Sequence, residues 1–187
     1  MNNELIMIVA VVIALAAIAA VAWAYSARTR RERLKQKFGP EYDRAVETLG
    51  TPAKAEAALL ERAKRVSRFK LHPLTADQAL AFDREWRRVQ SRFVDNPDDA
   101  VREADQLVTE VMAARGYPLE DFDTRADDLS VDHPRVVENY RTARVLAQRR
   151  QRGEAGTEEL RQAVVNYRAL FEDLLIDVDD RRQRRAS

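Results

Sequence analysis

The chain has 187 residues, no cysteine, five glycines and six prolines, and its 32 Lys/Arg against 31 Asp/Glu give a formal net charge of +1. The absence of cysteine excludes disulfides, thiolate metal sites and a cysteine nucleophile. The length allows a membrane anchor with one modest domain, and a composition dominated by Ala, Arg, Glu, Leu and Val favours helices over sheets.

The first feature along the chain is the uncharged stretch Leu5–Tyr25, LIMIVAVVIALAAIAAVAWAY. About 20 apolar residues make a helix that crosses a bilayer, so residues 1–27 are predicted to be a transmembrane anchor that begins near Leu5. Trp23 and Tyr25 stand where an interfacial aromatic belt is expected. Two alternatives are a buried core helix and a cleaved signal peptide, which would make the body secreted or extracytoplasmic; the preceding MNNE lacks the basic residues of a signal peptide.

Residues 28–39 are predicted to be a basic juxtamembrane helix that continues the anchor. Between residues 26 and 37 six basic residues stand against one Glu, and they are Arg28, Arg30, Arg31, Arg33, Lys35 and Lys37. Basic flanks stay on the cytoplasmic side, which predicts a single-pass protein of a bacterial inner membrane with its N-terminus outside and its C-terminal domain in the cytoplasm. The cluster is either a topology signal alone or also a contact for anionic membrane lipid. Ala16, Ala20 and Ala24 have the spacing that lets two spans pack, so a homo-oligomer is left open.

Residues 40–176 are predicted to be a soluble bundle of about six helices, and the fold class is all-α. Gly39-Pro40 ends the anchor helix. Apolar spacing and capping residues then indicate helices over 40–49, 52–69, 75–94 and 97–116, from Pro118 onward, over 134–151 and from Thr157 onward. The charged tail 177–187 carries no apolar pattern and is predicted to be disordered.

An aromatic stripe is the most prominent apolar pattern of the body. Phe82, Trp86 and Phe93 follow helical spacing. The stripe is either a bundle core or an exposed groove for a partner helix. A second hypothesis places a ligand pocket among Phe82, Trp86, Tyr140 and Tyr167.

The sequence contains little that indicates chemistry. His72 and His133 each precede a proline and are interpreted as turn residues, and no zinc-protease, P-loop, nucleophile-elbow or dinucleotide motif occurs. The acidic run Glu120–Asp128 fails the EF-hand spacing because Arg125 and Ala126 stand where a ligand and a glycine are required. We therefore expect no enzyme activity, no metal and no cofactor.

The charges of the body argue against nucleic-acid binding. Residues 38–176 hold 22 Lys/Arg against 26 Asp/Glu, and the two signs are interleaved. Spacings such as Glu61–Arg65 and Asp83–Arg87 predict ion pairs on helix surfaces.

Three stretches together resemble a family of bacterial proteins with one N-terminal span, a helical body and no assigned activity. They are FGPEYDRAV at residues 38–46, WRRVQSRFVD at 86–95 and SVDHPRVVENY at 130–140. The resemblance implies this architecture and a bacterial origin, and it implies no site residue.

The function expected from the sequence is a membrane-tethered scaffold or adaptor that binds another protein. The alternative is a small-ligand or stress-responsive sensor with a pocket in the bundle.

Overall fold

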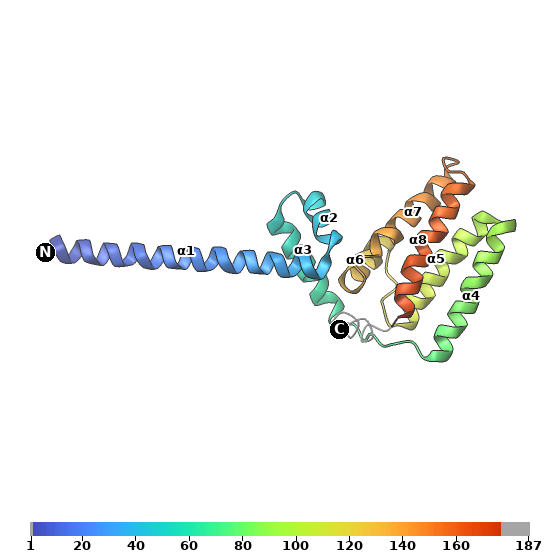
Figure 1. Ribbon diagram of the computed structural model, residues 1–187, viewed down its shortest axis with the longest axis horizontal. Helices are drawn as coiled ribbons and strands as arrows, with labels where there is room; N and C mark the ends of the chain where they lie inside the picture. Colours follow the sequence, from blue (N-terminus) through green and yellow to red (C-terminus); the bar gives the residue numbers. More distant parts are fainter. Residues whose placement is uncertain (1, 177–187) are drawn as a thin grey trace.

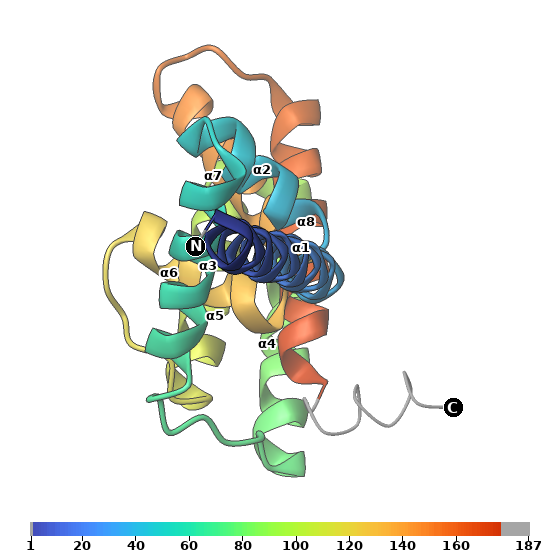
Figure 2. The ribbon, with the colours of Figure 1, turned by 90° about the vertical axis from the view of Figure 1, so that its left-hand side faces the viewer.

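The computed structural model describes residues 2–176, apart from the side chains of residues 2–6, 9–11 and 14. This part of the chain is folded into eight helices without a strand, so the prediction of an all-α fold is confirmed. The first helix, α1 (Asn2–Phe38), extends far out of the body, as Figure 1 shows. Seen end-on in Figure 2, it stands out from a body made of the seven later helices.

Helix α1 is unbroken from the uncharged stretch through the basic segment, as predicted. None of the helices in the described residues is both long enough and apolar enough to cross a membrane. The predicted span Leu5–Tyr25 is therefore not confirmed, and the side chains of Leu5 and five other residues in it lie outside the described ones. Trp23 and Tyr25 are described, and each is about three-quarters exposed.

The body contains seven helices in its described residues, one for each range that spacing and caps indicate and close to the bundle of about six that was expected. They are α2 (Pro40–Leu49), α3 (Pro52–Val66), α4 (Ala76–Asp95), α5 (Pro97–Ala114), α6 (Phe122–Asp132), α7 (Val137–Gln151) and α8 (Thr157–Leu175). The capping residues explain where several of them begin. The Thr75 hydroxyl accepts from the Gln78 amide at 3.2 Å, and the Gln78 side chain accepts from the Thr75 amide at 2.9 Å. Asn96 caps α5 by accepting from the Asp99 amide at 3.2 Å.

Helices α6 and α7 begin later than predicted. The Asp121 carboxylate accepts from the Thr124 amide at 3.0 Å, so the N-cap of α6 forms there and not at Pro118. Helix α6 then continues to Asp132, and residues 134–136 form a turn before α7. The predicted tail 177–187 lies outside the described residues.

The side chains form two apolar cores. The smaller core joins the end of α1 to α2, α3 and one residue of α6, and consists of Leu34, Phe38, Tyr42, Ala45, Ala55, Leu59, Val66 and Val131. The larger core lies among α4, α5, α6, α7 and α8. We call the end of α1 with α2 and α3 the stalk unit, and α4–α8 the bundle unit.

The aromatic stripe of α4 faces the larger core. Trp86 is 3% exposed, and its ring stacks on Phe171 of α8 with centroids 4.7 Å apart. Phe82 and Phe93 are partly buried against the same core. These three side chains therefore pack within the bundle unit, and the opposite face of α4 remains exposed.

Gly116 allows the chain after α5 to pass close to the connection between α3 and α4. Its φ is +89°, and a Cβ at this position would stand 2.6 Å from the carbonyl oxygen of Lys70. The adjacent Arg115 carbonyl accepts from the His72 amide at 3.1 Å. A side chain here would strain the backbone and also push the two segments apart.

We expect Gly116→Ala to lower the free energy of unfolding by about 2–4 kcal/mol, from backbone strain and the clash with Lys70 together. Gly153→Ala is the matched control, because Gly153 has φ +76° and a Cβ there would meet nothing within 4 Å. It should cost only about 1 kcal/mol. Chemical denaturation of the full chain in a mild detergent measures both, and equal losses would contradict the close approach.

Candidate functional site

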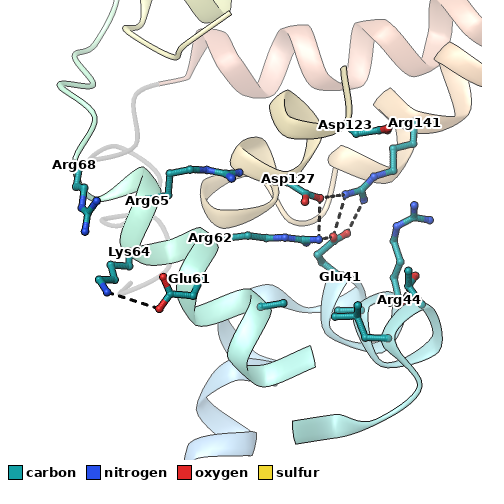
Figure 3. Close-up of a pocket in the computed structure, with 14 residues that line it drawn as sticks. Glu41, Arg44, Glu61, Arg62, Lys64, Arg65, Arg68, Asp123, Asp127 and Arg141 are labelled. Atoms are coloured by element: carbon teal, nitrogen blue, oxygen red, sulfur yellow. Dashed lines mark hydrogen bonds and ion pairs between the residues drawn. The ribbon is translucent and has the colours of Figure 1, made fainter. Parts of the chain in front are cut away.

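A charged cleft of about 620 Å³ lies between the stalk unit and the bundle unit. Helices α2 and α3 form one wall, and α6 and α7 contribute the other (Figure 3). Ten of its lining side chains are charged, and they are Glu41, Arg44, Glu61, Arg62, Lys64, Arg65, Arg68, Asp123, Asp127 and Arg141. Charged groups from both units therefore converge on one concave surface.

Glu41 is the buried centre of this surface. It follows Pro40 in the first turn of α2, and its side chain is 2% exposed. Its carboxylate accepts from Arg62 of α3 at 2.8 Å and from two nitrogens of Arg141 of α7 at 2.6 and 3.0 Å. A buried carboxylate is stable only when paired and hydrogen-bonded, and these two arginines satisfy that requirement.

Asp127 of α6 closes the arrangement into a ring. Its Oδ1 is 2.9 Å from Arg62 Nη2 and 3.3 Å from Arg141 Nη2, so each arginine bridges the two carboxylates. Burial raises the pKa of Asp127 above its usual value, although both arginines act in the opposite direction. Burial also works against the charge of Arg141, but its hydrogen bonds and attraction to Glu41 leave the pKa of Arg141 raised. We call these four residues the ion-pair ring.

A second ion pair joins the two units beside the ring. Arg65 of α3 contacts Asp128 of α6, with Nε 2.7 Å and Nη2 2.5 Å from Oδ1. The Asp128 side chain is 2% exposed, and burial raises the pKa of its carboxyl despite the neighbouring Arg65. The predicted pair Glu61–Arg65 is thus wrong, because Arg65 turns to α6 and Glu61 lies 3.7 Å from Lys64. The predicted pair Asp83–Arg87 is confirmed at 2.8 Å.

The basic residues predicted at the membrane lie on α1 and do not line the cleft. Arg28, Arg30 and Arg33 are exposed. Arg31, by contrast, links α1 to α3, because it donates to Glu56 at 3.0 Å. The same Glu56 oxygen accepts from the Tyr42 hydroxyl of α2 at 3.0 Å.

Lys35 and Lys37 also turn toward the stalk unit. The Lys35 ammonium is 5.5 Å from the Tyr42 ring centroid, and that of Lys37 is 5.4 Å from the Phe38 ring centroid. Arg31 and Lys35 therefore contact α3 and α2, whereas the Lys37 contact lies within α1 itself.

The aromatic residues proposed for a ligand pocket are packed against their neighbours. Tyr140 and Tyr167 are fully buried and meet edge to face with centroids 6.1 Å apart. Burial raises the pKa of Tyr140 to about 12. The cleft is lined by neither of them, nor by Phe82, Trp86 or Phe93.

His133 has a larger role than a turn residue. Its side chain is fully buried at the end of α6, with Nδ1 2.6 Å from Asp173 Oδ2 of α8. His72, by contrast, is exposed between α3 and α4.

Sequence reasoning also missed Glu41, although its spacing from Ala45 places it on the buried face of α2.

Comparison of the chain with known protein families, with curated proteins and with solved structures finds no match. The resemblance seen in the three sequence stretches therefore stays a prediction. Within residues 2–176, as far as their side chains are described, no three His, Asp or Glu side chains are grouped closely enough to hold a metal ion.

We expect Glu41→Gln to lower the free energy of unfolding by about 3–5 kcal/mol, because it leaves Arg62 and Arg141 without their buried counter-charge. Glu85→Gln is the matched control: Glu85 is about half exposed and, among the described residues, forms its ion pair with Arg88 on its own helix. It should cost less than about 1 kcal/mol. Denaturation of both variants in the same detergent tests this, and a loss at Glu41 no greater than at Glu85 would contradict the ring's importance.

Proposed function

We propose that the protein is a non-enzymatic, single-span membrane protein whose helical body binds another protein at the inner face of a bacterial membrane. One observation carries the proposal: α1 is a single helix with two different ends. Its first part is uncharged from Leu5 to Tyr25, and the described large apolar side chains there are 58–75% exposed. Its last turns carry Leu34 and Phe38, which are buried in the stalk unit.

An apolar helix that projects from a folded body into water exposes surface at a high free-energy cost. Burying apolar area stabilises by about 25 cal/mol per Å², so such a helix favours an apolar phase. At about 1.5 Å per residue, the nine residues from Tyr25 to Leu34 would hold the body roughly 14 Å from the membrane surface. Arg28, Arg30 and Arg33 lie in this interval, which supports an orientation with the body on the cytoplasmic side.

The exposed face of α4 is the surface that we propose for the protein partner. Leu80 and Val94 are 58% and 81% exposed, and Arg84, Arg87 and Ser91 fall between them at the spacing of one helix face. We call these five residues the α4 outer face. Helix α4 lies at the edge of the bundle unit, far from the free end of α1 (Figure 1). Arginine is enriched in protein-binding surfaces, and this face carries two arginines between two exposed apolar residues.

We expect the double variant Ile13→Arg/Ile18→Arg to move the protein from the membrane fraction to the soluble fraction, since two central charges cost about 5–7 kcal/mol in a bilayer. Val145→Arg/Val165→Arg, at exposed apolar positions of α7 and α8, should stay in the membrane fraction. Fractionation followed by alkaline carbonate washing measures both. A wild-type chain that is released by the wash would contradict anchoring.

The orientation is measured in the same cells. A reporter that is active only in the cytoplasm, fused after Ser187, should be active. Activity of the complementary periplasmic reporter alone would reverse the proposed topology.

For the partner, we expect cross-linking in intact membranes to give one stoichiometric protein complex with the wild-type chain. Leu80→Asp/Val94→Asp should reduce its yield at least about tenfold, because it places charges in the α4 outer face. Val145→Asp/Val165→Asp is the control and should keep the complex. Loss of the complex in both variants, or in neither, would exclude the α4 outer face.

A further inference from the structure

Cations enter the cleft from both units of the body. They lie on α2, on α3, just after α3 and on α7, and are Arg44, Arg62, Lys64, Arg65, Arg68 and Arg141. Figure 3 shows them distributed along the cleft rather than gathered at one end. The cations outside the ion-pair ring all come from α2, from α3 or from the residues just after α3, so they lie on one wall of the cleft.

The cations differ in how well they are paired. Arg62 and Arg141 belong to the ion-pair ring, and Arg65 pairs closely with Asp128. At the rim, Arg44 Nη1 is 3.6 Å from Glu138 and Lys64 Nζ is 3.7 Å from Glu61.

Arg68 makes no ion pair with any other described residue. Asp123 is the exposed acid on the opposite rim. It likewise forms no ion pair with the described side chains of residues 2–176. The ring thus forms a neutral floor, whereas the rim carries three loosely paired or unpaired cations, Arg44, Lys64 and Arg68, and two exposed carboxylates, Glu61 and Asp123.

The rest of the lining indicates the class of ligand. Guanidinium groups match the oxygens of a phosphate, and Arg44 and Arg68 have N–H groups to donate. Ala45, Leu49 and Ala58 supply apolar surface in the same cleft. The volume lies in the range of small-molecule sites, about 300–1,000 Å³.

We propose that this cleft binds a small phosphorylated molecule, with the rim cations contacting phosphate oxygens and the apolar lining contacting the uncharged part. The site does not depend on membrane attachment or on a partner at the α4 outer face. The proposed ligand site therefore lies at the boundary between the two units and not among the aromatic residues of the larger core.

The test is calorimetric titration of the detergent-solubilised full chain with inorganic pyrophosphate. We expect one saturable site that weakens as salt is raised. Arg44→Gln/Arg68→Gln should weaken binding at least about tenfold, because both residues lie outside the ion-pair ring and the fold should persist. Arg161→Gln/Arg168→Gln removes the same charge from exposed positions of α8, outside the cleft and the α4 outer face, and should leave the affinity within about twofold. Thermal denaturation checks that both variants remain folded.

Two results would overturn the proposal: no saturable binding to the wild-type chain, or equal weakening in the two double variants. A competition experiment then assigns the source of the phosphate. ADP displacing pyrophosphate at lower concentration than monomeric dihexanoyl phosphatidylglycerol supports a soluble ligand. If the phosphatidylglycerol displaces pyrophosphate at the lower concentration, the cleft is still a phosphate site, but its ligand is a lipid headgroup.

Discussion

The placement of the bundle unit against the stalk unit depends on the buried Glu41 carboxylate. The two apolar cores share little: Val131 of α6 belongs to the smaller core, and Phe69 and Leu71 touch both. The contact between the units combines this apolar packing with ion pairs, and Glu41 and Asp128 are the most enclosed charges in it. Because Glu41 is costly to bury unpaired, α3 and α7 must approach so that Arg62 and Arg141 both reach it. The ring thus defines the cleft as well as the docking of the units.

Local side-chain to backbone contacts make much of the fold predictable. The Thr75–Gln78 capping box and the Asn96 cap are complete within four residues of sequence, so the starts of α4 and α5 can be inferred directly. The start of α6 cannot, because Pro118 and Asp121 both signal a beginning and only the observed cap separates them. The stripe of α4 is evident in the sequence, but its role depends on Phe171, which lies far along the chain in α8.

The candidate site is not predictable for a related reason. Arg141 and Glu41 are 100 positions apart, and each falls in a helix where charged residues usually face water. Arg65 has a plausible local partner in Glu61 at helical spacing, yet it pairs with Asp128 of another helix. A sequence rich in interleaved Arg, Glu and Asp offers many equivalent pairings. Only packing decides among them, because the ionic contribution of any exposed local pair is small.

The two kinds of contact also give the two junctions of the molecule different sensitivities. Leu34 and Phe38 attach α1 to α2 and α3 through apolar burial, which neither salt nor an anionic ligand competes with. The junction between the units adds the ion-pair ring, whose buried and partly buried charges are screened less by salt than an exposed pair would be. Helix α1 and the α2–α3 wall of the cleft share the smaller core, while the opposite wall is joined to them by Val131 and by ion pairs. Because Glu41, Arg62, Asp127 and Arg141 both line the cleft and join its two walls, the width of the cleft depends on these four residues remaining paired.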